Sequence, residues 1–172
     1  MKKQKSTGMH PMDIDRNKIT LKKATISDIE TIIEYRIIFL EEVQGIPSKE
    51  LELSLRKCLR QYFTKSLGND SFISWIAEYE NKSIGFSGMV IREQPGNFEI
   101  PNGKTGYILN MFTLKEYRNH GIGSLLFQKL IDDAKQRNLD RIELHATQDG
   151  EPIYRRFGFI EPHDKVLEQK LK

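Results

Sequence analysis

The chain has 172 residues, of which 38% are hydrophobic and 30% are charged, a balance that is typical of one globular domain with a buried core. The formal net charge of +3 is too small to indicate nucleic-acid binding, and the stacking aromatic residues of a nucleic-acid surface are missing. No apolar run approaches the ~20 residues of a membrane span, and the N-terminus lacks the apolar region of a signal peptide. We therefore expect a cytoplasmic protein without a membrane or nucleic-acid partner.

The only cysteine is Cys58, which excludes an intrachain disulfide and favours a reducing compartment. It lies among Leu55, Leu59 and Tyr62 on the apolar stripe of a predicted helix, so we expect a buried structural thiol rather than a nucleophile. Because no spacing of His, Cys, Asp and Glu fits a metal site, we expect no metal cofactor.

The hydrophobic pattern divides the chain into a tail and one domain. Residues 1–17 are polar and without period, which predicts a mobile N-terminal tail before a single domain over residues 18–172. In the first half of this domain, apolar periodicity, caps and turn residues predict two helices and three strands. These are a strand over 19–24, a helix from Ser27-Asp28 to about Val43, a helix over 48–67, and a hairpin of strands 72–80 and 83–91.

The second half of the domain has the pattern of an α/β unit after a loop over residues 93–106. We expect a buried strand over 107–114, a helix over 121–138, a strand over 141–147, a short helix over 151–157 and a final strand over 166–171. A strand, helix and strand joined in this way form a right-handed crossover, so strands 107–114 and 141–147 should be parallel. The fold class is therefore α/β, with helices flanking one sheet.

A glycine-rich turn follows the central strand and opens the next helix. It runs from Arg118 to Gly123 and has the form R-x-x-G-x-G. The first turn of a helix has backbone N–H groups without intrahelical partners, and the helix dipole adds positive charge there. Glycines allow a phosphate to come close to the backbone, and Arg118 can add a charge-assisted contact. The turn is thus a predicted pyrophosphate site.

This segment resembles the acyl-CoA-binding motif of the GCN5-related N-acetyltransferases, the GNAT superfamily. A second match, at Ile153–Phe159, is similar to the late helix of the superfamily and its terminal Y-x-x-x-G-F, and residues 19–45 match its usual opening loosely. The resemblance covers residues 18–172. It implies a single-domain GNAT fold, in which a mixed, mostly antiparallel sheet has a parallel strand pair that is splayed at the acyl-CoA site.

The resemblance also implies which residues hold the co-substrate, acetyl-CoA. Backbone groups of the central strand would pair with the pantetheine arm, and backbone N–H groups of the glycine turn, with Arg118, would bind the pyrophosphate. The implied cofactor-binding residues are Met111, Phe112, Thr113, Arg118, Asn119, His120, Gly121, Ile122, Gly123 and Ser124.

Two further residues are candidates for catalysis. In the superfamily a tyrosine at the position of Tyr154 often points at the CoA sulfur, which implies a general acid; the alternative is a packing tyrosine beside Phe157 and Phe159. Asn110 is a polar residue in a predicted buried strand and must find hydrogen-bond partners there. It can either lie beside the acceptor amine or serve a structural hydrogen bond.

The general base is not set by the resemblance. Several superfamily members carry a glutamate eleven residues before the first position of the motif, and here that position is Tyr107. The remaining candidates are Glu41, Glu42, His145, or a water chain that includes Asn110.

The resemblance implies transfer of an acetyl group from acetyl-CoA to a primary amine by direct attack. The acceptor, a small amine or a protein or peptide amine, is not readable, but segments 41–50 and 93–106 should shape its pocket, and their acids (Glu41, Glu42, Glu50, Glu93 and Glu99) could attract a cation. Two other functions stay open: acyl-CoA binding without turnover, and an interaction module that binds no CoA. Exposed strand edges make either a monomer or a homodimer compatible with the sequence.

Overall fold

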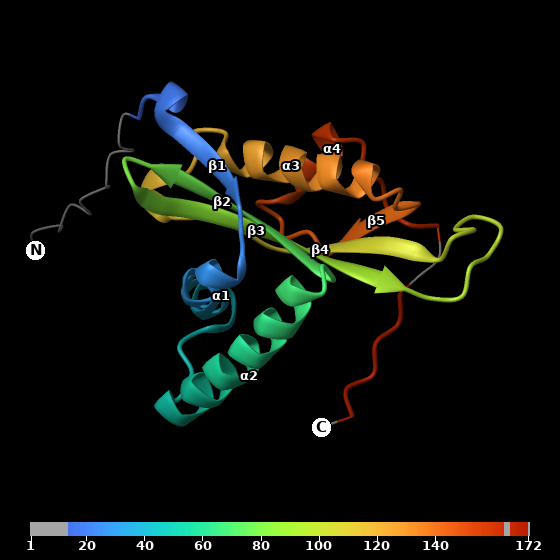
Figure 1. Ribbon diagram of the computed structural model, residues 1–172, viewed down its shortest axis with the longest axis horizontal. Coiled ribbons are helices and arrows are strands. Elements are labelled where there is room, and N and C mark those ends of the chain that lie inside the picture. The colour runs from blue at the N-terminus through green and yellow to red at the C-terminus, as the bar shows by residue number, and fades with distance from the viewer. Residues whose placement is uncertain (1–13, 164–165, 172) are drawn as a thin grey trace, which may run out of the picture.

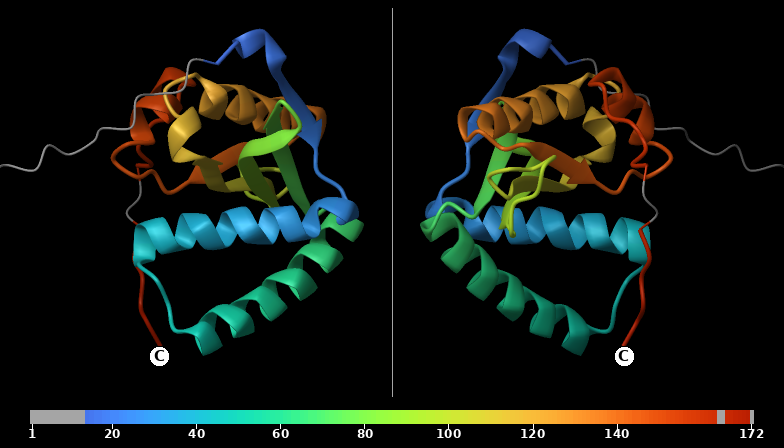
Figure 2. Two further views of the ribbon diagram at one scale, coloured as in Figure 1. Left: turned by 90° about the vertical axis from the view of Figure 1, so that its left-hand side faces the viewer. Right: turned by 90° about the vertical axis from the view of Figure 1, so that its right-hand side faces the viewer.

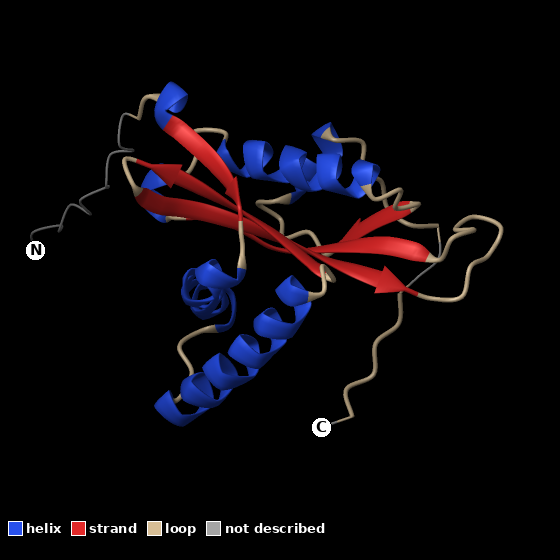
Figure 3. Cartoon of the chain, viewed as in Figure 1, coloured by secondary structure: helices blue, strands red, loops and turns tan. Residues whose placement is uncertain are grey.

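The computed structural model describes residues 14–163 and 166–171. Its helices and strands follow the predicted order and are shown in Figures 1 and 3. They are β1 (Ile19–Lys23), α1 (Ile29–Gln44), α2 (Lys49–Gly68), β2 (Phe72–Tyr79), β3 (Lys82–Glu93), β4 (Lys104–Thr113), α3 (Ile122–Gln136), β5 (Arg141–Leu144) and α4 (Glu151–Arg156), with single-turn 3-10 helices at Arg16–Lys18, Ile26–Asp28 and Lys115–Tyr117.

The strands form one five-stranded sheet in the order β1-β2-β3-β4-β5. The first four strands are antiparallel and β5 is parallel to β4, as the crossover from β4 through α3 requires. The predicted mixed, mostly antiparallel sheet with one parallel pair is therefore confirmed.

Helices cover both faces of this sheet. The helices α1 and α2 lie against one face, and α3 with α4 lies against the other (Figures 1 and 2). Under α1 and α2 the core is built from large aliphatic and aromatic side chains such as Ile33, Phe63 and Phe86. Under α3 it contains Phe127, Leu130 and neighbouring residues of β4. The amphipathic period of each helix thus places its apolar stripe on the sheet.

A buried carboxylate fixes α3 to the far side of the sheet. Asp133 is 6% exposed; its two oxygens accept hydrogen bonds from Trp75 Nε1 at 2.6 Å and Lys23 Nζ at 2.5 Å. Burial of a carboxylate is unfavourable unless it is paired and hydrogen-bonded, and both conditions hold here. The contact joins α3 to β1 and β2 and so holds the helix whose first turn carries the glycine motif.

The structure corrects two expectations about the N-terminal half of the chain. Residues 14–17 belong to the fold, because Ile14 is 6% exposed and packs against Ile84 and Leu126; residues 1–13 of the predicted tail lie outside the described residues. Cys58 is exposed, since α2 buries only the face that carries Leu59 and Phe63.

The predicted final strand over 166–171 is wrong. Its apolar side chains Val166, Leu167 and Leu171 are 77%, 90% and 86% exposed, and none of these described residues is in a strand. An alternating pattern produces a strand only where another strand offers hydrogen-bond partners, and β5 ends at Leu144 without pairing to this segment. β5 is also shorter than predicted, and β4 begins within the predicted loop.

Close packing at Gly88 gives a stability prediction. An ideal Cβ on Gly88 would lie 2.6 Å from Cζ and 2.8 Å from Cε2 of Phe72, whose ring is 1% exposed and cannot move away. We expect Gly88→Ala to reduce the free energy of unfolding by about 1–3 kcal/mol in urea titrations, because overpacking forces side chains out of place. Gly68→Ala is the matched control, since nothing lies within 4 Å of its Cβ position; equal stabilities of the two variants would contradict the prediction.

Candidate active site

The parallel strands β4 and β5 separate at their carboxyl ends. They pair from Thr105 with Arg141 to Ile108 with Leu144; β4 then continues to Thr113, whereas β5 ends. Beyond Ile108, β4 therefore has no β5 partner, and ligands of α/β sheets bind in such openings. A cleft of ≈ 60 Å³ lies there. It is lined by Phe39, Ile108, Leu109, Asn110, Met111, Leu144, His145, Thr147 and Tyr154.

A β-bulge in β4 shapes this opening. Phe86 pairs with Phe112 and Gly88 pairs with Leu109, so β4 has one residue more than β3 between these pairs. The extra residue is accommodated at Asn110, whose φ of 58° lies in the left-handed region that asparagine adopts more readily than most residues. A bulge re-aims side chains, and Asn110 is one of the residues that line the cleft.

The glycine motif forms the N-terminal end of α3, as predicted. Asn119 and Gly121 both have left-handed φ angles, 67° and 78°, and Gly121 is the N-cap of α3. No side chain caps this end, and the first intrahelical bond is donated by the N–H of Leu125 to Gly121. The N–H groups of the first turn are thus directed to solvent, where an anion can accept their hydrogen bonds.

Arg118 is engaged by the protein rather than directed at this turn. Its two terminal nitrogens donate to the two oxygens of Glu42, each at 2.8 Å, and its Nε donates to the Thr113 carbonyl at 2.9 Å. The guanidinium hydrogen bond from Arg118 keeps the pKa of Glu42 below its ordinary value, and Glu42 raises the pKa of Arg118. The arginine therefore ties the end of β4 to α1, a role that the motif alone does not predict.

A second arginine lies at the turn. The guanidinium of Arg16 contacts Gly121, filling the space that a side chain at this position would need. Arg16 is exposed and has no carboxylate at ion-pair distance within residues 14–163 and 166–171. Sequence reasoning missed Arg16 because it fell in the predicted tail; the burial of Ile14 and the 3-10 helix after Asp15 place it here.

Tyr154 of α4 also lines the cleft. It is 9% exposed and packs on Phe127, with ring centroids 5.1 Å apart, so the packing alternative holds for the ring. Its hydroxyl has no hydrogen-bond partner among the described residues, and burial raises the pKa of the phenol. The hydroxyl is therefore a protonated donor that is free for a ligand.

His145 is the base candidate that the structure brings to the cleft. It follows β5 directly, and its Nδ1 is hydrogen-bonded to the hydroxyl of Tyr107, the residue at the position where a glutamate was expected. If Nδ1–H donates to the phenol oxygen, Nε2 keeps its lone pair and can accept a proton. Glu41 and Glu42, by contrast, do not line the cleft, and the lowered pKa makes Glu42 a weaker base.

This gives a prediction for Glu42→Gln. We expect kcat to stay within about threefold of the wild-type value, because an exposed ion pair contributes little and a weak base is lost. The dissociation constant of acetyl-CoA should fall by about threefold, since Arg118 becomes available to a phosphate group. Steady-state kinetics and calorimetry measure both; a loss of kcat of more than about tenfold would reinstate Glu42 as the base.

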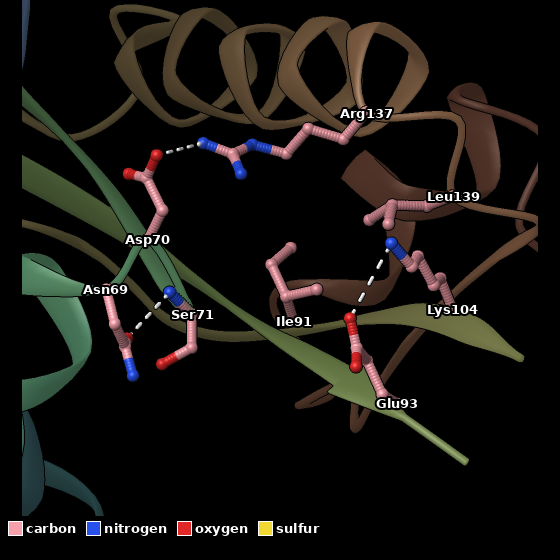
Figure 4. A pocket seen from close by; sticks show the side chains of 8 residues that line it. All are labelled: Asn69, Asp70, Ser71, Ile91, Glu93, Lys104, Arg137 and Leu139. Atoms are coloured by element: carbon pink, nitrogen blue, oxygen red, sulfur yellow. Dashed lines mark hydrogen bonds and ion pairs between the residues drawn. The ribbon is translucent and has the colours of Figure 1, made fainter.

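The acids that were expected to attract a cationic acceptor are largely paired. Glu93 lies 3.6 Å from Lys104, Glu99 lies 2.6 Å from Arg141, and Glu42 is held by Arg118. A larger hollow of ≈ 520 Å³ lies at the other end of β4 (Figure 4). Its charged side chains are likewise paired, Asp70 with Arg137 at 3.4 Å and Glu93 with Lys104. None of the predicted catalytic or cofactor-binding residues lines this hollow.

In the part of the chain that the structure describes, no three His, Cys, Asp or Glu side chains are grouped as metal ligands. Within the same residues, no helix has the length and apolar character needed to cross a membrane.

Comparisons with known proteins agree with this geometry. Residues 38–159 match the model of the acetyltransferase (GNAT) family. N-alpha-acetyltransferase 30 of Schizosaccharomyces pombe is 31% identical over 75% of this chain and 83% of its own length. The crystal structure of a predicted acetyltransferase with acetyl-CoA from Clostridium acetobutylicum superposes with a TM-score of 0.81, at 31% identity over 89% of this chain and 96% of that one. A GCN5-related N-acetyltransferase of Ralstonia eutropha shares the fold, with a TM-score of 0.76 at 23% identity over 88% of this chain and 98% of that one.

The fold, the splayed strands and the glycine turn are thus those of an enzyme that transfers acyl groups. The chain belongs to the acetyltransferase (GNAT) family, which confirms the resemblance seen in its motifs.

Proposed function

We propose that the protein transfers an acetyl group from acetyl-CoA to a primary amine by direct attack, without an acyl-enzyme. The observation that carries the proposal is the cleft between β4 and β5, where Asn110, His145 and Tyr154 meet. Transfer between two bound substrates requires the donor, a proton acceptor and a leaving-group partner in one place. The only thiol, Cys58, is exposed on α2 and does not line the cleft.

Acetyl-CoA would be held by the backbone. The end of β4 from Met111 to Thr113 would pair with the pantetheine arm, because it lacks a β5 partner. The N–H groups of the turn from Asn119 to Ser124 would bind the pyrophosphate. Arg16 would supply the cation at that turn, since Arg118 is occupied by Glu42. The His120 Nδ1 lies 3.2 Å from the Tyr117 carbonyl, so His120 would contribute its backbone rather than its imidazole.

In the reaction the amine nitrogen attacks the thioester carbonyl carbon, forming the C–N bond, and the C–S bond breaks. The amine loses a proton to His145 Nε2, and the departing thiolate accepts a hydrogen bond from the Tyr154 hydroxyl. A backbone N–H of β4, such as that of Phe112, would stabilise the developing oxyanion. The proposed base and acid thus line the same cleft.

The relatives indicate only the chemical class of the acceptor, which is an amine. The fission-yeast relative is named an N-alpha-acetyltransferase, which supports an amine acceptor for this chain. The alternative is a domain that binds acyl-CoA without turnover, and the tyrosine at position 107 in place of a glutamate favours it.

Calorimetric titration with acetyl-CoA, followed by CoA release over a panel of amines, tests the proposal. Binding with release is the expected result. Binding without release from any amine would favour the alternative, and no binding would contradict both.

The role of His145 is testable separately. We expect His145→Gln to lower kcat by about 10- to 100-fold at neutral pH, because the proton acceptor is lost while the side chain keeps a similar size. The dissociation constant of acetyl-CoA should change by less than about twofold. Tyr107→Phe is the companion variant and should cost only about threefold, since it removes one hydrogen bond to the imidazole. If His145→Gln keeps the wild-type kcat, His145 is not the base, and a water chain would accept the proton of the amine instead.

A further inference from the structure

A residue of α1 fixes the orientation of the side-chain amide of Asn110. Its Oδ1 accepts a hydrogen bond from the Arg36 guanidinium of α1. Arginine has five donors and no acceptor, so only the amide oxygen can face it. The Nδ2 group must then point the other way. Because Asn110 lines the cleft, the amide presents two N–H donors on the side away from Arg36.

These donors have no partner in the described residues. Nδ2 of Asn110 is buried and makes no hydrogen bond there, and the residue is 3% exposed. A buried donor without an acceptor costs about 1–3 kcal/mol, and such groups in native structures call for an explanation. An oxygen atom of a ligand in the cleft would remove this cost.

The charge behind the amide is also uncompensated. Arg36 is half-buried, no carboxylate lies at ion-pair distance from it among the described residues, and burial lowers its pKa. Buried charges are normally paired. The positive charge of Arg36 is therefore not balanced by a neighbouring carboxylate among the described residues.

We propose that Asn110 and Arg36 recognise a carboxylate on the acceptor, and that the acceptor is a free α-amino acid. This rests on the proposed acetyl transfer. A carboxylate oxygen would accept from Asn110 Nδ2, and the Arg36 charge would stabilise the anion through the polarised amide. Since the cleft also holds His145 and Tyr154, the carboxylate must lie only a few atoms from the attacking nitrogen. An α-amino acid has that spacing, and a peptide amide lacks the charge.

The test uses the full chain with saturating acetyl-CoA and measures CoA release. The acceptors are the twenty standard amino acids, their amides, and the matching amines without a carboxyl group. We expect at least one amino acid to be acetylated with a kcat/KM about 100-fold above that of its amide and its decarboxylated amine. Amides or decarboxylated amines that react as well, or no reaction with any amino acid, would overturn carboxylate recognition. The acetyl transfer itself fails only if no amine reacts.

Two variants separate recognition from folding. Asn110→Asp keeps an oxygen for Arg36 but replaces the N–H donors with a negative charge. It should lower kcat/KM for the amino acid by about 100-fold more than for the amide. Arg36→Gln should lower kcat/KM for the amino acid by about tenfold more than for the amide. Arg60→Gln, which breaks only the outer pair with Glu30, should change neither value. If Asn110→Asp lowers kcat/KM equally for the amino acid and its amide, Asn110 does not recognise the carboxylate. Asn110 would then contact the acetyl group instead, and the proposal would be overturned.

Discussion

Acetyl-CoA binding should be weakened by at least about 100-fold in Gly121→Glu. Gly121 has a φ of 78° and lies at the free N-terminal end of α3. Glutamate at this position would strain the backbone by about 1–2 kcal/mol and would place a carboxylate where the phosphates are expected. Because the guanidinium of Arg16 fills the adjacent space, it would pair with the new carboxylate and be withdrawn from the ligand. Calorimetric titration with acetyl-CoA measures the effect.

The control for this result is Gly45→Glu. Gly45 has a comparable φ of 86° but ends α1 rather than beginning α3, and nothing lies within 4 Å of its Cβ position. The same charge and a left-handed backbone should leave the dissociation constant within about threefold. If both variants lost binding equally, the effect would be one of folding. If Gly121→Glu bound normally, the phosphate site would lie elsewhere.

Features of the fold that depend on local sequence could be predicted. The helix periods, the hairpin at Asn81-Lys82 and the crossover after β4 are encoded by neighbouring residues, and the structure has all of them. The glycine turn was likewise visible, because it has backbone conformations that only a few residue types adopt.

Features that depend on distant partners could not be predicted. Arg118 pairs with Glu42, 76 residues away, and Asn110 meets Arg36, 74 residues away. Such contacts follow from how α1 crosses the sheet, which periodicity does not reveal. The same holds for residues 166–171, where an alternating pattern has no strand to pair with. A residue type can therefore indicate a chemical role, but its partner decides whether it is available for that role.

Tyr154→Phe should lower kcat by about 10- to 100-fold and leave stability and acetyl-CoA affinity nearly unchanged. The substitution removes only the hydroxyl, which has no hydrogen-bond partner in the described residues, and keeps the ring on Phe127. Pre-steady-state and steady-state rates with a reactive amine measure the change. Tyr79→Phe, which alters a tyrosine that is 8% exposed and outside the cleft, should keep the wild-type rate.

The size of this effect follows from the direction of proton transfer. A phenol has an ordinary pKa near 10 and a thiol near 8.5, so full transfer to the thiolate is uphill by about 2 kcal/mol. Burial raises the pKa of Tyr154, which makes transfer still less favourable and keeps the phenol protonated below about pH 10. The hydroxyl should then stabilise the thiolate by a hydrogen bond, and no fall of kcat between about pH 7 and 9 should arise from its ionisation. A descending limb in that range that disappears in Tyr154→Phe would show instead that Tyr154 titrates near neutral pH and transfers its proton.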